Sequence, residues 1–480
     1  MIYNVYLFLS KNKKRYSQDD LKNLFKCSEE KIVHYINILK EYSIIRTVKK
    51  NNKQKDITDL VEEDIEISVS QKFNDDYYYI FKYVGITIVE NMVLKIYPKY
   101  IDSTDEPIKE LKQILSVLEK YNSKEQIIKI FNNSEDNNSF NYLALLLFFI
   151  NDYYDNDLYS NDINITEENG NGEINWDRTI NDGFSIIKGN KPYYLNYYTN
   201  KRISNNLDYF RQLHAWIISM CSKELKNADL LYLFNIEEIE LSNYNLDDFG
   251  DVDYILYRIE NELDKQFNTR KIYLLKAMYA YISKKGNFDN ISYFSTYGTA
   301  NFNLVWEEVI AVIFDNQLYS PLYKLNIENN NYTKDDEKKL IDLIEKPIWK
   351  LNNTSSFLAD TLKPDTITFQ DNIMYIYDAK YYKLLIKNNK IINQPGIESI
   401  TKQYLYHLAY KKFIEKHNIT KVENYFVLPI ENKNLSNHFN VSLEMMNELD
   451  LPSIEVIFIE ASDAFDHYLK NKIYAIKINN

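Results

Sequence analysis

The spacing of the apolar residues changes several times along this chain of 480 residues, and this limits the possible folds more than any other feature of the sequence. Residues 77–97 form β-branched and aromatic runs that are broken at Gly85 and Asn91, a pattern typical of a small strand meander. Between 105 and 285 the apolar residues mostly recur every three or four positions, as in helices. Since the chain is also too long for one compact core, it predicts a multidomain α+β protein.

These changes divide the chain into four predicted domains. They are a basic winged-helix head at 1–60, a β-rich segment at 61–104, a mainly helical middle domain at 105–285 and an α/β domain with a mixed sheet at 286–480. Within the helical domain, the acidic and Asn-rich interval 151–171 predicts a loop, whereas the spacing over 255–281 predicts helix.

The head is basic although the whole chain has a net charge of −12. Residues 1–55 hold thirteen Lys or Arg and five Asp or Glu, a balance of +8. Ser17 and Ser28 each suit the start of a short helix, and the apolar run 44–48 then predicts a strand. A winged helix places its second helix in the DNA major groove, and a protein-binding winged helix with a solvated lysine loop is the alternative. The lysines predicted to contact nucleic acid are Lys31, Lys49, Lys50, Lys53 and Lys55.

Several classes of protein are excluded by what the sequence lacks. Two cysteines, Cys27 and Cys221, cannot form a disulfide scaffold and fit a reducing cytoplasm. The best apolar stretch, 142–150, is about half of the roughly 18–20 residues that a membrane span needs, and the first ten residues lack the basic region of a signal peptide. The six histidines are scattered, so a structural zinc is not expected, and His214 is expected to be packed in a helix. The sequence therefore predicts a soluble cytoplasmic protein.

The final third places two aspartates and a lysine in a strand–turn–strand pattern. Asp365 leads into a strand-forming run over 366–369, a turn follows at 371–372, and a second run ends in Asp378-Ala379-Lys380. Asp378 and Lys380 are two residues apart in a strand, so their side chains point to the same face of the sheet. An Asp on one strand and Asp-x-Lys on the next is the PD-(D/E)xK nuclease arrangement. A surface hairpin with solvated Asp and Lys is the alternative.

These side chains have the chemistry that phosphodiester hydrolysis requires. A hard cation such as Mg²⁺ takes oxygen ligands, which Asp365, Asp378 and the backbone carbonyl of Ala379 can supply. The metal offsets charge on the scissile phosphate and lowers the pKa of a bound water, while Lys380 can hold or deprotonate that water and offset developing charge. An acid on the preceding apolar helix, Glu307, can ligate a second metal or orient the water.

Two further segments belong to the same predicted domain. A helix over 399–415 places Gln403 where it can contact the site or the DNA, although an ordinary amphipathic helix explains the same pattern. Strand-forming runs at 424–428 and 453–459 would complete a mixed sheet flanked by helices.

Four short motifs, spread over about 77–410, carry a family resemblance. They are Phe81-Lys82-Tyr83-Val84-Gly85 with Tyr97-Pro98-Lys99-Tyr100; Gly172-Glu173-Ile174-Asn175-Trp176-Asp177-Arg178-Thr179-Ile180; Val305-Trp306-Glu307; and Pro364-Asp365 with Asp378-Ala379-Lys380 and Lys402-Gln403-Tyr404. In this order they resemble the LlaJI-type restriction endonucleases, relatives of McrC, the nuclease subunit of the McrBC 5-methylcytosine restriction system.

The resemblance implies a type II/IV-like restriction endodeoxyribonuclease that cleaves double-stranded DNA in phage defence, together with a separate McrB-like AAA+ partner that hydrolyses GTP. It aligns Asp365, Asp378 and Lys380 with the catalytic residues, and it favours Glu307 over Glu308. The sequence contains no Gly-x-x-x-x-Gly-Lys-Ser/Thr, so it has no P-loop of its own and GTP would bind the partner. A cognate cytosine methyltransferase is a further candidate partner in the same system.

Two alternatives stay open at this point. Arg178 could reach the nucleotide site of the partner, where an arginine supplied in trans speeds phosphoryl transfer, or it could simply pair with Asp177 or Asp182. The whole chain could also be a non-enzymatic winged-helix DNA-binding regulator whose hairpin acids have no catalytic role.

Overall fold

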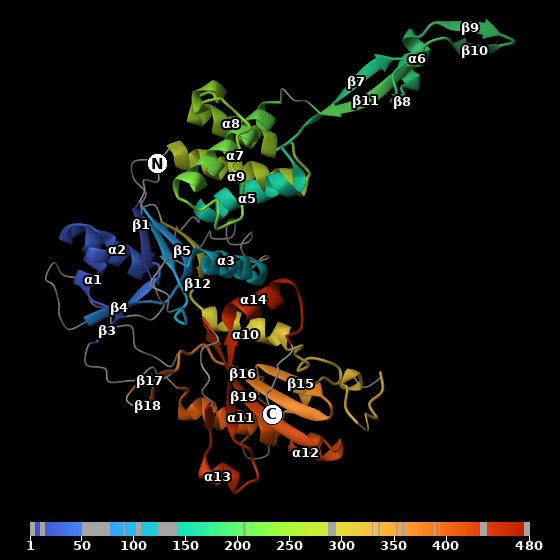
Figure 1. The fold of residues 1–480 in the computed structure, drawn as a ribbon. Helices are drawn as coiled ribbons and strands as arrows, with labels where there is room; N and C mark the ends of the chain where they lie inside the picture. Colours follow the sequence, from blue (N-terminus) through green and yellow to red (C-terminus); the bar gives the residue numbers. More distant parts are fainter. Residues whose placement is uncertain are drawn as a thin grey trace. The chain divides into compact units, whose positions relative to one another are not determined.

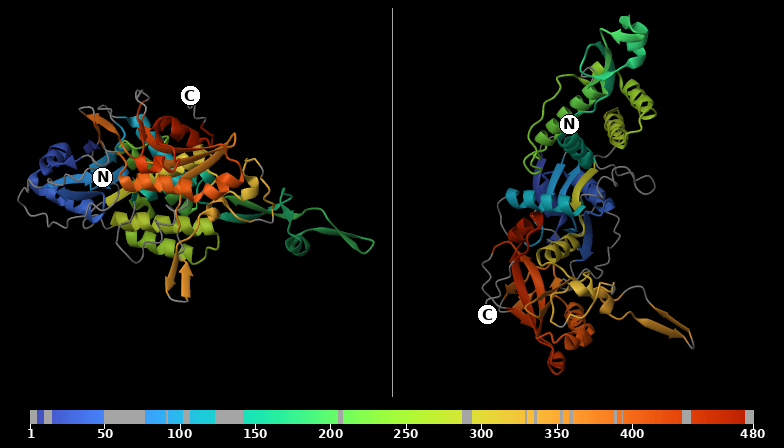
Figure 2. Two further views of the ribbon diagram at one scale, coloured as in Figure 1. Left: turned by 90° about the horizontal axis from the view of Figure 1, so that it is seen from below. Right: turned by 90° about the vertical axis from the view of Figure 1, so that its right-hand side faces the viewer.

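The chain folds into two compact units, which the computed structural model in Figure 1 and Figure 2 shows as ribbons. Unit 1 comprises 1–2, 135–231 and 236–293, and unit 2 comprises 3–134, 232–235 and 294–480. The residues that the structure describes are 5–9, 15–49, 77–90, 92–101, 107–122, 142–204, 208–286, 294–328, 330–334, 337–351, 354–357, 361–387, 390–392, 394–432 and 439–474.

Two short helices and a three-stranded antiparallel sheet form the head of unit 2, in the predicted order. The elements are α1 (Gln18–Phe25), α2 (Glu29–Glu41), β2 (Arg15–Tyr16), β3 (Ile45–Lys49) and β4 (Tyr77–Phe81), with the sheet order β2-β4-β3. The hydroxyl of Ser17 accepts a hydrogen bond from the Asp20 amide, and the Asp20 carboxylate accepts one from the Ser17 amide. Ser28 caps α2 in a similar way by accepting from the Lys31 amide. Both predicted helix starts are therefore confirmed.

The predicted β-rich segment at 61–104 is divided between two sheets. While β4 pairs with β3, the next two strands join a second sheet in the order β1-β6-β5-β12. Its strands are β1 (Val5–Leu9), β5 (Val84–Val89), β6 (Met92–Ile96) and β12 (Phe294–Thr299). Gly85 and Gly298 face each other across β5 and β12, where a Cβ on Gly85 would lie 2.2 Å from the Tyr297 carbonyl oxygen. The predicted meander is confirmed for β5 and β6, which pair antiparallel, but it is wrong for β4, which pairs with β3 of the head.

A five-stranded mixed sheet forms the centre of the C-terminal part of unit 2. Its order is β15-β16-β19-β21-β20, in which β16, β19 and β21 are parallel and the two edge strands are antiparallel. The strands are β15 (Thr366–Gln370), β16 (Ile373–Ala379), β19 (Lys421–Ile430), β20 (Phe439–Val441) and β21 (Ile454–Glu460). The predicted mixed sheet is confirmed.

Helices cover both faces of this sheet (Figure 1). They are α10 (Phe302–Ile313), α11 (Ile397–Ala409), α12 (Lys411–Lys416) and α14 (Ala461–Leu469). On one face, Met374 and Ile376 pack in a cluster with Tyr406 and Phe413 of α11 and α12. On the other face, the Tyr377 ring lies 4.6 Å from the ring of Phe314, at the end of α10. The helix predicted over 399–415 is thus two helices, which meet at Tyr410.

The remaining described elements of unit 2 are one long helix, one short helix, two hairpins and two 3-10 turns. They are α3 (Ile108–Asn122), α13 (Glu444–Asn447), the hairpins β13 (Ile348–Leu351) with β14 (Thr354–Phe357) and β17 (Leu385–Lys387) with β18 (Lys390–Ile392), and the 3-10 turns Leu322–Lys324 and Leu340–Leu343. Helix α3 contacts α14, so the start of the predicted middle domain at 105–285 packs with the C-terminal part of the chain. In the described residues no helix is long and apolar enough to cross a membrane.

The described part of unit 1 combines a group of four helices with an arm of short strands and one short helix. The helices are α5 (Tyr142–Asn156), α7 (Tyr209–Asn227), α8 (Val252–Leu263) and α9 (Thr269–Gly286), together with the 3-10 turn Leu246–Phe249. The arm consists of β7 (Asp162–Glu168), β8 (Glu173–Ile174), α6 (Trp176–Asp182), β9 (Ser185–Lys188), β10 (Lys191–Tyr194) and β11 (Tyr198–Ser204). The loop predicted over 151–171 is wrong, because α5 continues to Asn156 and β7 pairs with β11 along its whole length.

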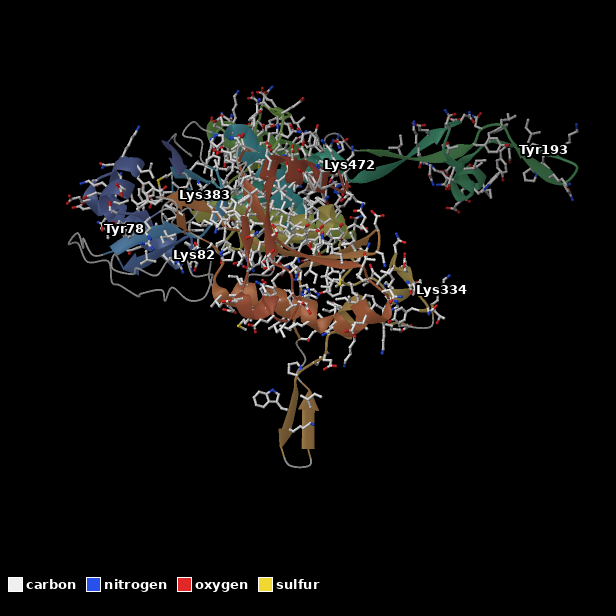
Figure 3. All side chains as sticks on the ribbon, turned by 60° about the horizontal axis from the view of Figure 1, so that its bottom comes forward. Tyr78, Lys82, Tyr193, Lys334, Lys383 and Lys472 are labelled. Atoms are coloured by element: carbon white, nitrogen blue, oxygen red, sulfur yellow. The ribbon has the colours of Figure 1, made fainter. Side chains whose placement is uncertain are left out.

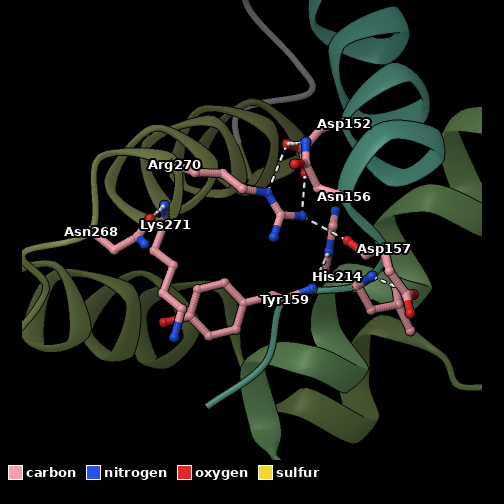
Figure 4. Close-up of polar contacts among 9 residues, drawn as sticks. Asp152, Asn156, Asp157, Tyr159, His214, Asn268, Arg270 and Lys271 are labelled. Atoms are coloured by element: carbon pink, nitrogen blue, oxygen red, sulfur yellow. Dashed lines mark hydrogen bonds and ion pairs between the residues drawn. The ribbon is translucent and has the colours of Figure 1, made fainter. Parts of the chain in front are cut away.

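Polar contacts hold the root of the arm to the helices of unit 1 (Figure 4). The Arg270 guanidinium donates to both carboxylate oxygens of Asp152, at 3.0 and 2.7 Å, and to the Asp157 carbonyl at 2.7 Å. The Tyr159 amide donates to Nδ1 of His214 at 3.0 Å, and the His214 side chain is completely buried. The prediction that His214 is a packed helix residue is confirmed.

Burial of His214 makes the stability of unit 1 depend on pH. Burial lowers the pKa of His214 from 6.5 to about 3, with smaller contributions from Arg270 and Arg211. Between these two values the unfolded chain binds a proton that the folded chain does not, so stability falls as the pH falls. We expect about 2 kcal/mol less unfolding free energy at about pH 5 than at about pH 7.5 from this residue alone.

Urea unfolding at the two pH values, followed by tryptophan fluorescence, measures this loss. A His214→Gln chain keeps an acceptor near the Tyr159 amide but does not titrate, so its stability should change less between the two pH values. An identical pH dependence in both proteins would contradict a neutral buried imidazole.

Candidate active site

The strand–turn–strand segment brings its two aspartates together. Asp371 and Asn372 have φ angles of 50° and 59°, as required by the tight turn that best fits the twist of a hairpin. The register pairs Thr366 with Tyr377, which places Asp365 beside Asp378. The Ala379 amide donates a hydrogen bond of 2.9 Å to Oδ2 of Asp365. The hairpin is therefore formed as predicted, and its two acids occupy one end of it.

Lys380 belongs to the same group. Its Nζ lies 2.9 Å from Oδ2 of Asp378, and the two side chains are 22% and 7% exposed. Burial by itself lowers the pKa of Lys380, but the carboxylates of Asp378, Asp365 and Glu307 outweigh this and raise it. The ammonium group is therefore charged and held among acids, which excludes a freely solvated Asp and Lys pair.

The acid predicted from the preceding helix also faces this group. Glu307 of α10 is half-buried, whereas Glu308 is exposed. Burial raises the pKa of Glu307, Lys380 lowers it, and Asp378 raises it again, so Glu307 lies within electrostatic reach of both residues. Glu307 is therefore the acid of α10 that faces Lys380 and Asp378, and its role in the site stays a prediction.

One backbone oxygen joins α10 to the strand end that carries Lys380. The Val427 carbonyl on β19 accepts a hydrogen bond of 2.9 Å from the Lys380 amide and one of 3.1 Å from the indole Nε1 of Trp306. Trp306 directly precedes Glu307 and is completely buried. The positions of Glu307 and Lys380 are thus fixed against a common point of the sheet.

The carboxylates repel one another strongly. Burial, followed by the Asp378 carboxylate, raises the pKa of Asp365 well above its usual range, and Glu307 adds to the effect. A divalent cation would relieve this repulsion, and the available donors are carboxylate and carbonyl oxygens of the kind that Mg²⁺ prefers. Within the described residues, no group of three or more His, Cys, Asp or Glu is arranged closely enough to hold a metal ion. The donor chemistry fits a hard cation, for which Asp365, Asp378 and the Ala379 carbonyl are the candidate ligands.

The structure places Gln403 inside the protein. Its side chain is completely buried, and its Nε2 donates a hydrogen bond of 3.0 Å to the Ile376 carbonyl of β16. This corrects the expected DNA contact, because the amide supports the strand that carries Asp378 and does not face solvent. Helical spacing placed Gln403 on a face of the helix but did not show that this face covers the sheet.

Two residues near the acids were not predicted from the sequence. Lys363 is exposed, interacts electrostatically with Asp365 and Glu307, and has its Nζ 5.4 Å from the ring centre of Tyr319. Tyr406 is buried, and burial, followed by Asp378, Asp365 and Glu307, raises its pKa. The Lys-Pro-Asp sequence that ends in Asp365 was an available signal for Lys363.

The lysines predicted to bind nucleic acid are only partly described. Lys31 is exposed on α2. Lys49 is the last residue of β3, where its backbone lies opposite Tyr77 of β4. Lys50, Lys53 and Lys55 lie outside the described residues. The adjoining His34 of α2 has its Nε2 2.6 Å from the Glu90 carboxylate, which belongs to the turn between β5 and β6.

Arg178 lies far from the acids in sequence, on helix α6 of the arm. Its Nε is 3.4 Å from Oδ2 of Asp182, both side chains are at least half exposed, and its guanidinium lies 5.0 Å from the ring centre of Tyr198. The local pairing with Asp182 that the sequence left open is therefore present. An exposed pair of this kind contributes at most about 1 kcal/mol and leaves the guanidinium free to exchange partners.

Comparison with known proteins gives one family and a few distant relatives. A family model described as LlaJI restriction endonuclease matches residues 83–462. The Type II restriction enzyme BsuMI component YdjA of Bacillus subtilis (strain 168) is 27% identical over 413 residues, which cover 82% of each protein.

Two solved structures are also similar. A half-complex from a tetradecameric assembly of Thermococcus gammatolerans McrB AAA+ hexamers with bound McrC matches with 12% identity and a TM-score of 0.39, over 97% of this chain and 100% of that one. The T. gammatolerans McrBC complex seen by cryo-electron microscopy matches with 12% identity and a TM-score of 0.25, over 64% and 86%.

Proposed function

The chain belongs to the LlaJI restriction endonuclease family, and from this premise we propose that it is the Mg²⁺-dependent DNA-cleaving subunit of a restriction system. The observation that carries the proposal is the approach of Lys380 to Asp378, with Asp365 held at the neighbouring strand position. Two carboxylates and an ammonium group at the end of adjoining strands are suited to phosphodiester hydrolysis and have no evident structural need for one another.

Each residue has a distinct role in this proposal. Asp365, Asp378 and the Ala379 carbonyl would hold Mg²⁺, which when bound offsets charge on the phosphate and lowers the pKa of a water ligand. Lys380 orients the attacking water and offsets the charge that develops on the phosphate. Glu307 accepts a hydrogen bond from that water or contributes to a second cation site. Val427 and Trp306 position Lys380 and Glu307 through the shared backbone carbonyl.

Cleavage of plasmid DNA tests the proposal. The full chain is incubated with supercoiled plasmid, Mg²⁺, GTP and a McrB-like AAA+ protein. The expected product is cut DNA, and EDTA should abolish the cutting. A winged-helix regulator would instead bind the plasmid without Mg²⁺-dependent cutting. Removing residues 1–60 separates the nuclease from the regulator further. A nuclease would keep its acids and its lysine, whereas a regulator would lose its DNA binding.

We also propose that GTP hydrolysis is supplied by a McrB-like AAA+ partner that contacts the arm. The sequence has no P-loop motif, and the arm presents many apolar side chains to solvent, as protein interaction sites do. The exposed apolar side chains of the arm include Trp176, Ile180, Phe184, Ile186, Ile187, Tyr193 and Leu195. Tyr193 is labelled on the arm in Figure 3. A cytosine methyltransferase would be the other member of such a system.

Arg178 provides a sharp test of this contact, because its local partner offers a matched control. If the guanidinium reaches the nucleotide site of the partner, Arg178→Ala lowers the GTP hydrolysis that this chain stimulates by at least about tenfold. Asp182→Ala breaks the same local ion pair but leaves the arginine in place, so hydrolysis should be unchanged. Equal losses in both variants, measured as phosphate release, would assign Arg178 to the structure of the arm.

A further inference from the structure

The β13–β14 hairpin stands apart from the other elements of unit 2, as both views in Figure 2 show. Among the described strands, β13 and β14 pair only with each other, in a register that runs from Ile348 with Phe357 to Leu351 with Thr354. An isolated two-stranded hairpin is marginally stable in water, so one that is built into a folded protein usually has a partner to pack against.

The first strand exposes large apolar side chains. Trp349 is 67% exposed and Ile348 is 51% exposed, and since they are adjacent in a strand they point to opposite faces. By contrast, Trp216 and Trp306 are buried. The hairpin therefore presents an indole on one face and an aliphatic side chain on the other, and the described residues leave both more than half exposed.

The charge of the hairpin indicates the chemistry of the missing partner. Lys346 and Lys350 are exposed and flank Ile348 and Trp349, with no acid between them. Bulky apolar side chains framed by lysines suit nucleic acid, because the side chains can wedge between base steps while the ammonium groups contact phosphates.

The hairpin is also connected directly to the candidate active site. The Thr361 hydroxyl donates a hydrogen bond of 2.7 Å to the Glu345 carbonyl, which closes the base of the hairpin. Four residues after Thr361 comes Asp365, and between them Lys363 is exposed and interacts with Asp365 and Glu307. The base of the hairpin thus leads to Asp365, which directly precedes β15, with the exposed ammonium group of Lys363 between them.

We propose that the β13–β14 hairpin binds duplex DNA next to the cleavage site, with Trp349 inserted against base pairs and Lys346 and Lys350 on the phosphates. This rests on the proposed nuclease function and names the element that holds its substrate. The contact is non-specific in sequence, because an indole recognises the face of any base and lysines recognise the backbone.

Fluorescence of Trp349 tests the contact without requiring cleavage. In a Trp176→Phe, Lys380→Ala chain, Trp349 is the exposed indole, since Trp216 and Trp306 are buried. Titration with an unmodified mixed-sequence duplex should quench this fluorescence, because stacked bases quench an indole. Trp349→Ala should weaken binding of the same duplex about tenfold in fluorescence anisotropy, and Trp349→Phe should restore part of the loss.

Matched substitutions separate the charge contribution from the aromatic one. Lys350→Gln should weaken binding and reduce the slope of log affinity against log salt by about one. Phe267→Ala removes another exposed aromatic side chain, which is 93% exposed in unit 1, and should leave DNA affinity unchanged.

The outcomes distinguish this proposal from the nuclease assignment. If wild-type protein cuts plasmid with Mg²⁺ but Trp349 is not quenched and Trp349→Ala binds DNA normally, the hairpin proposal alone is wrong. Trp349→Ala could instead bind DNA normally but cut it no faster when the AAA+ protein is added, or change its oligomeric state in size-exclusion chromatography. Either result would make the hairpin a protein interface and overturn the DNA assignment. Absence of cutting by wild type under all conditions would contradict the nuclease assignment itself.

Discussion

Replacing Lys380 with alanine should reduce the rate of Mg²⁺-dependent DNA cleavage at least about a thousandfold. The ammonium group is 2.9 Å from Oδ2 of Asp378, and the Lys380 side chain is mostly buried. Its removal leaves the carboxylates of Asp365 and Asp378 without the group that offsets charge on the phosphate. Cleavage of supercoiled plasmid in single-turnover conditions measures the rate.

The control for Lys380 is another lysine of the same unit. Lys412 has a side chain that is 92% exposed and pairs only loosely with Glu345, at 3.5 Å, so Lys412→Ala should cleave at the wild-type rate. A melting curve shows whether Lys380→Ala is folded, and the DNA affinity of the folded variant should remain measurable. Wild-type cleavage by Lys380→Ala would remove the basis for a catalytic site at this hairpin.

Replacing Trp306 with alanine should lower the unfolding free energy of unit 2 by about 3–5 kcal/mol, the usual effect of truncating a large buried aromatic residue. The indole is completely buried, packs at 6.1 Å against Phe465 of α14, and donates to the Val427 carbonyl. Because Glu307 follows in the same helix turn, the cavity should also displace that carboxylate and reduce cleavage. Urea unfolding, followed by loss of secondary structure, measures the stability.

A graded series separates packing from the hydrogen bond. Trp306→Phe keeps a ring but cannot donate to Val427, so it should lose less stability than Trp306→Ala while still slowing cleavage. Leu304 lies on the exposed side of the same helix and is 43% exposed, so Leu304→Ala should change the unfolding free energy by less than about 1 kcal/mol. Equal stability of wild type and Trp306→Ala would show that α10 is not held by this residue.

Local sequence patterns were enough to predict the hairpin that forms the site. Asp371 and Asn372 tolerate positive φ angles, and the flanking runs are rich in β-branched and aromatic residues, so the turn and the register follow from neighbouring residues. Helix starts at Ser17 and Ser28 were predictable for the same reason. Each of these features depends on residues that are close together in the chain.

Features that depend on distant residues could not be predicted in this way. Strand β12 pairs with β5 across roughly two hundred positions of sequence, which no local pattern indicates. Strand β7 could not be predicted because its segment is rich in Asn and acidic residues, which are uncommon in strands. It is stabilised as a strand by its pairing with β11. The inward direction of Gln403 depends on how α11 lies on the sheet, which the helical period does not determine.

The two hydrogen bonds at Val427 are accepted by a main-chain oxygen, and this affects which substitutions the position can accept during evolution. Replacing the side chain of Val427 with another apolar residue that fits this buried position does not remove the acceptor, so the link between α10 and the strand end that carries Lys380 would persist. A position with such tolerance looks ordinary in an alignment of relatives. The atom that links α10 to the strand end of Lys380 would therefore escape any search based on residue identity alone.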